Sequence, residues 1–310
     1  MELSPEFNSP YIPVQKIEDP LLEGLGTSLF ILRTDLIHPV VSGNKWFKLK
    51  YNLIKAHEQG KRSLLSFGGP WSNHLHALAE AGRLFNFKTI GLVRGELSAP
   101  LNSCLDDAKK AGMLLEGISR SIYREKENPD YLRSLQQRFP DAYLIPEGGA
   151  NREGIQGCAE LNLYFDENQY DLICMSCGTG TMLAGLATTS AIPLLGFQVL
   201  KGNNYLNRQI SNNLQKFGLS SHCKWSINDT FHFGGYAKTT EELITFISRF
   251  ERINKIPLEP IYSGKMLYGL YELIKKRDFF PQNSRIMVIH GGGLQGKRSF
   301  VYNTPLNTIR

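Results

Sequence analysis

The chain has 310 residues, of which 42% are hydrophobic and 21% charged, as is typical of a globular protein with one large or two smaller cores. Its formal net charge is +6, but no block of five like charges occurs, which argues against a nucleic-acid-binding protein. No apolar run approaches the length of a membrane span. We therefore expect neither a nucleic acid nor a membrane as a partner.

The chain contains five cysteines, an odd count that argues against a disulfide framework and favours a reducing compartment. Cys174 and Cys177 form a lone CxxC pair without the further ligands of a zinc site, so we predict buried thiols and no metal. The N-terminus is acidic and interrupted by Pro5, unlike a signal peptide. These features predict a cytoplasmic protein.

After an irregular N-terminal region, apolar strands and helices alternate along the chain. The predicted strands span 28–32, 63–67, 89–93, 142–145, 171–175, 194–197 and 285–289. The predicted helices span 45–57, 72–85, 102–112, 129–138, 151–166, 181–188, 204–217, 240–253 and 264–276. Such alternation indicates mostly parallel sheets covered by helices on both faces. We predict an α/β protein with two doubly wound domains, each a three-layer αβα arrangement.

A lysine at position 45 lies beside small and amide-bearing residues, in Ser42-Gly43-Asn44-Lys45, just ahead of a predicted helix. A lysine that forms a Schiff base needs a backbone that a cofactor can approach, and partial burial that lowers its pKa. Most lysines are solvated surface residues, so this stretch alone leaves both interpretations open.

The loop Gly178-Thr179-Gly180-Thr181 lies between a predicted strand and a predicted helix. Glycines let an anion approach the free N–H groups at a helix start, and the threonines add hydroxyl donors. The loop is not a GxGxxG motif, and it is either a phosphate-binding loop or an ordinary strand-to-helix turn.

A second glycine-rich loop, Gly291–Arg298, nearly matches the nucleotide-binding pattern GxxxxGK[ST]. Arg298 stands where the magnesium-binding hydroxyl would be, and only about a dozen residues follow the loop. We therefore reject a nucleotidase and predict a glycine turn that lines a pocket.

The stretch Gly68–His74 also joins a predicted strand to a helix. Ser72 is a common helix-capping residue type, and this structural role competes with ligand binding by Ser72 and Asn73 at the helix start. His74 and His76 fall on different helix faces and do not form a metal pair, so we expect His74 to be a surface or supporting residue.

Taken in order, these stretches resemble the 1-aminocyclopropane-1-carboxylate deaminase/D-cysteine desulfhydrase family, which are pyridoxal-phosphate enzymes with the tryptophan-synthase β-subunit fold (fold type II). The matching pieces, from about residue 40 to residue 296, are SGNKWFKL, SFGGPWSNH, IPEGGANREGIQG, CGTGTMLAGL, GGYA, IYSGKMLYGL and IHGGGLQG. The resemblance implies a large cofactor-binding domain made of residues 1–47 and 157–310, a small α/β domain of residues 48–156, and a homodimer.

The resemblance also implies roles for individual residues. Lys45 would hold pyridoxal 5'-phosphate as a Schiff base, and Asn73 would bind the phenolic oxygen of its ring. Gly178, Thr179, Gly180 and Thr181 would cradle the phosphate, with Lys48 as a helper. Ser72, Tyr236 and Tyr262 would act on the substrate side, and Ser263 would face the pyridine nitrogen.

Three positions depart from the family pattern: Trp71, Ser263 and Gly291. Deaminases of this family have glutamate where this chain has Ser263, and a hydroxyl there is expected to leave the ring nitrogen neutral. We therefore predict a lyase of D-cysteine desulfhydrase type, which forms pyruvate, sulfide and ammonia from a small amino acid. The alternatives are a deaminase that hydrolyses 1-aminocyclopropane-1-carboxylate to 2-oxobutyrate and ammonia, and a non-catalytic protein that binds pyridoxal phosphate.

Overall fold

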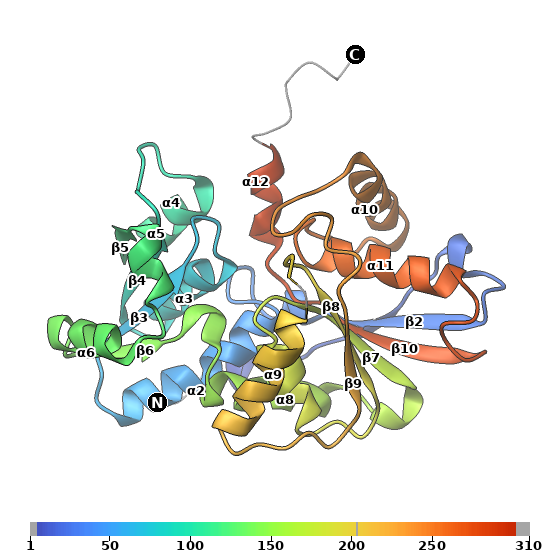
Figure 1. The fold of residues 1–310 in the computed structure, drawn as a ribbon. Helices are drawn as coiled ribbons and strands as arrows, with labels where there is room; N and C mark the ends of the chain where they lie inside the picture. The colour runs from blue at the N-terminus through green and yellow to red at the C-terminus, as the bar shows by residue number, and fades with distance from the viewer. Residues whose placement is uncertain (1–4, 203, 302–310) are drawn as a thin grey trace, which may run out of the picture.

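The protein contains two sheets, each covered by helices (Figure 1), in a computed structural model that describes residues 5–202 and 204–301. The larger sheet has the strand order β1-β2-β10-β7-β8-β9. Its strands are β1 (Val14–Lys16), β2 (Thr27–Leu32), β7 (Leu172–Cys177), β8 (Leu194–Gln198), β9 (Trp225–Asn228) and β10 (Ser284–Ile289). Only β1 runs antiparallel to its neighbour.

The smaller sheet is wholly parallel and has the strand order β5-β4-β3-β6. Its strands are β3 (Ser63–Gly68), β4 (Lys88–Arg94), β5 (Met113–Ile118) and β6 (Ala142–Ile145). The α/β fold class is therefore confirmed. The domain boundaries at 47/48 and 156/157 stay a prediction.

Most helices lie between strands that follow one another in the chain. They are α1 (Pro5–Asn8), α2 (Asn44–Glu58), α3 (Asn73–Leu84), α4 (Ser103–Lys110), α5 (Arg120–Arg124), α6 (Pro129–Arg138), α7 (Arg152–Ala159), α8 (Thr181–Ala187), α9 (Tyr205–Lys216), α10 (Glu241–Asn254), α11 (Ser263–Lys275) and α12 (Arg298–Val301). Short 3-10 helices η1 to η6 occupy Pro20–Leu22, Thr34–Leu36, Glu147–Gly149, Glu160–Tyr164, Glu167–Gln169 and Leu294–Lys297. Among the described residues, none of these helices combines the length and apolarity needed to cross a membrane.

Alternate residues of the central strands face opposite helix layers. Ile173 and Met175 of β7 pack in the core that includes α8 and α9, while Cys174 packs in the core that includes α10 and α11. In the smaller sheet, the neighbouring residues Leu64 and Leu65 of β3 likewise pack in two different cores. Figure 1 shows α8 and α9 on one side of the larger sheet and α10 and α11 on the other. Both faces are thus covered, as the apolar strands predict.

Three strands, β1, β5 and β9, were not predicted, and all three lie at sheet edges. All side chains of β9 and most of those of β5 are half-buried or exposed. Such strands do not need the continuous apolar run by which a buried strand is recognised in a sequence. The helix predicted over 151–166 also differs, because α7 ends at Ala159 and continues as a 3-10 helix to Tyr164.

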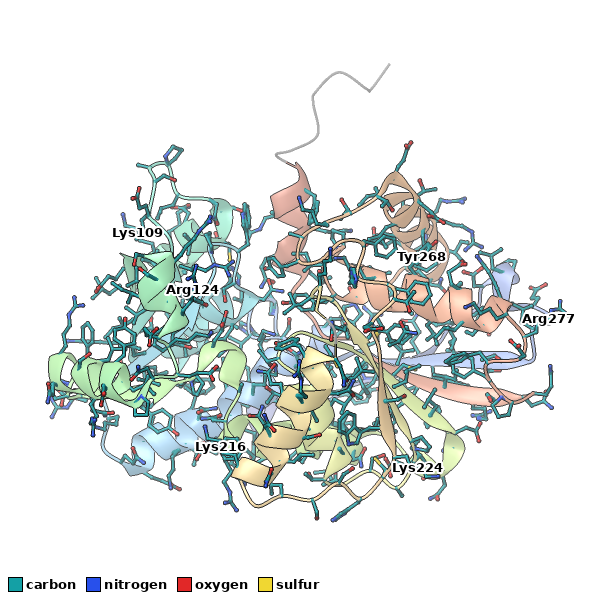
Figure 2. The ribbon with its side chains drawn as sticks, viewed as in Figure 1. Lys109, Arg124, Lys216, Lys224, Tyr268 and Arg277 are labelled. Carbon is teal, nitrogen blue, oxygen red and sulfur yellow. The ribbon has the colours of Figure 1, made fainter. Side chains whose placement is uncertain are left out.

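Exposed basic side chains lie at separate places on the surface. Figure 2 shows Lys109 and Arg124 beside the smaller sheet, and Lys216, Lys224 and Arg277 around the larger one. The positive net charge is thus spread over the molecule, as the sequence indicates.

Helices α2, α7 and α8 pack with their backbones in close approach. A Cβ atom at Gly157 of α7 would lie 1.8 Å from the carbonyl oxygen of Phe47 in α2. A Cβ atom at Gly185 of α8 would lie 2.6 Å from the carbonyl oxygen of Ile155 in α7. Because this packing leaves no room for a methyl group, α7 holds α2 at a set distance from α8.

We predict that Gly157→Ala lowers the free energy of unfolding by about 1–3 kcal/mol, because the added methyl group overpacks the contact with α2. At a solvent-exposed position inside a helix, the same change would stabilise the protein by about 1 kcal/mol. Urea unfolding measures the difference. Gly202→Ala is the control, since its Cβ would lie 3.6 Å from its nearest neighbour, on Tyr205. Equal stabilities of the two variants would contradict the packing argument.

Candidate active site

Lys45 is the second residue of α2, and a backbone contact between Gly43 and the glycine-rich loop that begins at Gly291 places it. Gly43 has a φ of +60°, and a Cβ atom there would lie 2.1 Å from the carbonyl oxygen of Gly291. The N–H group of Asn44 donates to the same oxygen at 3.3 Å. The start of α2 is thus held against the loop that follows β10.

The Lys45 amine is half-buried, and it forms no ion pair with a carboxylate of the described residues; its Nζ donates to Oδ1 of Asn44 at 2.8 Å. Burial and the nearby Lys48 ammonium lower the pKa of Lys45 to about 7, against a smaller opposing influence of Cys158 and Glu259. A lysine with this pKa is partly neutral at neutral pH, which is the form that attacks a carbonyl carbon.

Lys48 lies one turn along α2 and faces the predicted phosphate-binding loop. Its side chain is buried, and its Nζ donates to Oγ1 of Thr179 at 3.3 Å. The hydroxyls of Thr179 and Thr181 are 2.8 Å apart. Burial lowers the pKa of Lys48. A cation and two hydroxyls therefore converge beside Lys45, as an anion site requires.

Asn73 begins α3, and a residue of the 3-10 helix Leu294–Lys297, which follows β10, orients its amide. Oδ1 of Asn73 accepts a hydrogen bond from Nε2 of Gln295 at 3.0 Å. A Cβ atom at Gly293 would lie 2.4 Å from Nδ2 of Asn73. Ser72 caps the helix, with its Oγ accepting from the N–H of Leu75 at 3.2 Å. The capping role of Ser72 is thus observed, and its predicted substrate role remains a prediction.

His74 is buried, so of the two expected positions, surface or supporting, only the supporting one remains. Its Nε2 lies 3.0 Å from Oγ of Ser66, whereas its Nδ1 has no hydrogen-bond partner among the described residues. Burial, with Lys45 and Lys48 nearby, holds the pKa of His74 well below its ordinary value, so the ring is neutral. His76 instead pairs with Asp107 at 3.1 Å. In the described part of the chain, no group of three His, Cys, Asp or Glu side chains could hold a metal.

Tyr236 and Tyr262 lie together beside the predicted phosphate-binding loop. Their ring centroids are 6.3 Å apart, and a Cβ atom at Gly178 would lie 3.1 Å from the ring of Tyr262. The hydroxyl of Tyr236 donates to the carbonyl oxygen of Trp71 at 3.3 Å. Desolvation raises the pKa of both hydroxyls, so both stay protonated. The structure thus brings together the predicted site residues from both sheets.

Two functional candidates were missed in the sequence, and Lys265 is one of them. Its side chain is fully buried, and its Nζ donates to the carbonyl oxygens of His232 at 2.9 Å and Gly235 at 2.7 Å. Burial lowers the pKa of Lys265 to about 8. Lys265 therefore anchors the Gly234-Gly235 turn that presents Tyr236. Its place in the motif IYSGK gave no signal that distinguishes it from a surface lysine.

The second missed candidate is Glu259, which is fully buried in front of α11. Its carboxylate accepts hydrogen bonds from the N–H groups of Ile261 at 2.8 Å, Tyr262 at 2.9 Å and Ser263 at 2.6 Å. The hydroxyl of Ser263 lies 3.0 Å from Oε1 of Glu259. Burial raises the pKa of Glu259, while these hydrogen bonds oppose the shift. In a sequence, a glutamate four positions before the first residue of a predicted helix is only a weak capping signal, because many surface glutamates occupy similar positions.

The family comparison agrees with this arrangement. A model of the pyridoxal-phosphate-dependent enzymes matches residues 3–292 of the chain. The chain belongs to this family. It is 28% identical over 297 residues to the bifunctional D-cysteine desulfhydrase/1-aminocyclopropane-1-carboxylate deaminase, mitochondrial, of Arabidopsis thaliana, with 87% of this chain and 73% of that protein covered. It is 24% identical over 301 residues to the D-cysteine desulfhydrase of Yersinia pestis (strain Pestoides F), with 91% of each covered.

A solved structure of an 1-aminocyclopropane-1-carboxylate deaminase homologue matches this enzyme with a TM-score of 0.80 at 26% identity, covering 94% of this chain and 92% of that one. The predicted subfamily, fold class and pyridoxal-phosphate cofactor are therefore confirmed. The residues present also fit the cofactor, since a lysine of lowered pKa lies beside a cation and paired hydroxyls suited to a phosphate.

We predict that Lys48→Met raises the pKa of Lys45 above about 7, because a neighbouring positive charge is removed. The pH dependence of Lys45 arylation in cofactor-free protein, followed by peptide mass spectrometry, measures this pKa. Lys50→Met is the matched control, because Lys50 lies on the same helix and pairs with Glu160 at 2.7 Å. An unchanged Lys45 pKa in Lys48→Met would show that the two amines do not interact.

Proposed function

We propose that this enzyme is a pyridoxal-phosphate-dependent lyase of D-cysteine desulfhydrase type, which eliminates a β leaving group from a small amino acid. The observation that carries the proposal is the Lys45 amine, with its pKa of about 7, beside the anion site of Lys48 and Thr179. With D-cysteine, the elimination and the hydrolysis that follows consume one water and yield pyruvate, sulfide and ammonia.

The chain's own residues would hold the cofactor at four points. Lys45 would bind it covalently, and the 178–181 loop with Lys48 would hold its phosphate. Nδ2 of Asn73 would donate to the phenolic oxygen, because Oδ1 already accepts from Gln295. Ser263, fully buried at the start of α11, would face the ring nitrogen. Bound pyridoxal phosphate supplies an electron sink for the bond broken at the α-carbon.

The same residues account for proton transfer. Lys45, once displaced by the substrate amine, would remove the α-proton, since a base with a pKa near 7 suits neutral pH. Ser72 and the protonated hydroxyls of Tyr236 and Tyr262 would line the substrate side and donate hydrogen bonds to its carboxylate or leaving group. Trp71 would close this side, because its carbonyl oxygen binds Tyr236.

The second candidate is 1-aminocyclopropane-1-carboxylate deaminase activity. The space beside Gly291 supports this candidate. The nearest neighbours of a Cβ atom at Gly291 would be Oγ of Ser176 at 3.6 Å and Nδ2 of Asn44 at 3.7 Å. The wall beside Asn44 thus lacks a side chain, and the space there would take the second ring carbon that 1-aminocyclopropane-1-carboxylate carries on its α-carbon, where cysteine has only a hydrogen. A non-catalytic cofactor-binding protein is the third candidate. The homodimer and the cytoplasmic location also stay predictions.

We predict that the purified holoenzyme releases sulfide and pyruvate in equal amounts from D-cysteine, and that Lys45→Ala lowers the rate by roughly 10²–10⁴-fold, the usual contribution of a general base. Colorimetric sulfide and coupled pyruvate assays measure both products. The same enzyme is assayed with 1-aminocyclopropane-1-carboxylate for 2-oxobutyrate.

The outcomes separate the candidates. Production of 2-oxobutyrate without sulfide would replace the first candidate with the second. A protein that carries the cofactor but turns over neither substrate, nor any of a panel of D- and L-amino acids, would be the non-catalytic binder. Lys50→Met serves as the control for general effects of changing α2, because its partner Glu160 lies outside the site residues named above.

A further inference from the structure

The buried carboxylate of Glu259 lies in front of α11, where it accepts hydrogen bonds from the first residues of that helix and the residues before it. A Cβ atom at Gly296 would lie 3.7 Å from Oε2 of Glu259 and 3.9 Å from Oδ1 of Asn73, so Glu259 approaches the Asn73 side. Its neighbour Tyr262 packs against Gly178 of the phosphate-binding loop. The start of α11 therefore lies between the Asn73 side and the phosphate side of the site.

The covalent structure of pyridoxal phosphate then decides which atom meets this wall. The carbon that Lys45 binds is flanked on the ring by the phosphate arm and the phenolic oxygen, and the ring nitrogen lies opposite it. With the phosphate at Thr179 and the oxygen at Asn73, the nitrogen would point toward the start of α11. Ser263, which is fully buried there, would be the residue that meets it.

The hydroxyl of Ser263 has no proton to offer this nitrogen. Its single proton goes to Glu259, whose Oε1 lies 3.0 Å and whose carbonyl oxygen lies 3.3 Å from Oγ. Oγ also accepts the N–H of Glu259 at 3.0 Å. A hydroxyl has one donor and two acceptor sites, so one acceptor site remains. A group that meets Oγ from the ligand side must therefore donate the hydrogen bond.

The carboxylate of Glu259 is suited to stay ionised although it is buried. Both of its oxygens accept N–H donors at the positive end of α11, a helix of 13 residues. Glu259 forms no ion pair with any of the described residues, and it acts on Lys45 and Lys265 only through longer-range electrostatic attraction. A buried negative charge of this kind favours a cation nearby.

We propose that Glu259, acting through Ser263, keeps the ring nitrogen of bound pyridoxal phosphate protonated. The proposal rests on the proposed function for the orientation of the cofactor, and it reverses the expectation that Ser263 leaves this nitrogen neutral. Glu259 is a positioning residue in this account, because it acts on the ring through Ser263. The acidic group that the deaminase pattern has at position 263 is supplied here from position 259.

A protonated ring nitrogen makes the cofactor a stronger electron sink. The enzyme can then break bonds whose leaving groups are poorer than a thiol, such as the strained carbon–carbon bond of a cyclopropane ring. The Glu259–Ser263 pair therefore widens the substrate class of the proposed site beyond β-substituted amino acids with good leaving groups.

The test is ¹⁵N NMR of the holoenzyme carrying pyridoxal phosphate labelled at the ring nitrogen. The wild-type resonance is expected at the position of a pyridinium throughout the neutral pH range. Glu259→Gln and Ser263→Ala are expected to move it to the position of a neutral pyridine, and Glu259→Asp to restore it. Asp19→Asn is the matched control, because Asp19 is also buried and also caps a helix, but at Pro20–Leu22.

A neutral ring nitrogen in the wild type, or a pyridinium signal that survives in both Glu259→Gln and Ser263→Ala, would overturn the proposal. If Glu259→Gln fails to fold, Ser263→Ala still provides the test, because in that variant the backbone N–H groups before α11 still bind the carboxylate of Glu259. A protein without a borohydride-reducible bond between Lys45 and the cofactor would instead overturn the proposed function. The two failures are therefore distinguishable.

Discussion

The backbone contact between Gly43 and Gly291 is the constraint on which the rest of the site depends. Any side chain at Gly43 would enter the carbonyl group of Gly291, so α2 can start here only on a glycine. Gly157 sets the other side of α2 by its contact with Phe47. Between these contacts the first turn of α2 is held in place, and with it the amine of Lys45.

Buried charges of both signs then define the chemistry. Lys45 and Lys48 lie close together with lowered pKa values, so the pocket gains stability from an anion such as a phosphate. Glu259 supplies a negative charge at the start of α11, and Lys265 anchors the turn that carries Tyr236. The cofactor that fits is therefore anionic at one end and cationic at the other.

The central strands, most helices and the glycine-rich loops were predictable, because buried strands read as apolar runs and the loops follow them directly. The edge strands β1, β5 and β9 were not, since half of their surroundings are solvent or loops and their sequences mix polar with apolar residues. Lys45, Asn73 and Thr179 carry motif signals. Glu259 does not, because only the packing of α11 turns this residue from a loop glutamate into a buried carboxylate.

The central claim is that Lys45 is the residue that binds pyridoxal phosphate, and borohydride reduction tests it most directly. The holoenzyme is reduced, digested and mapped by mass spectrometry for the pyridoxyl-lysine peptide. We predict that the label is on Lys45 alone. A label on Lys48 or Lys265, or a cofactor that stays unlinked after reduction, would contradict it.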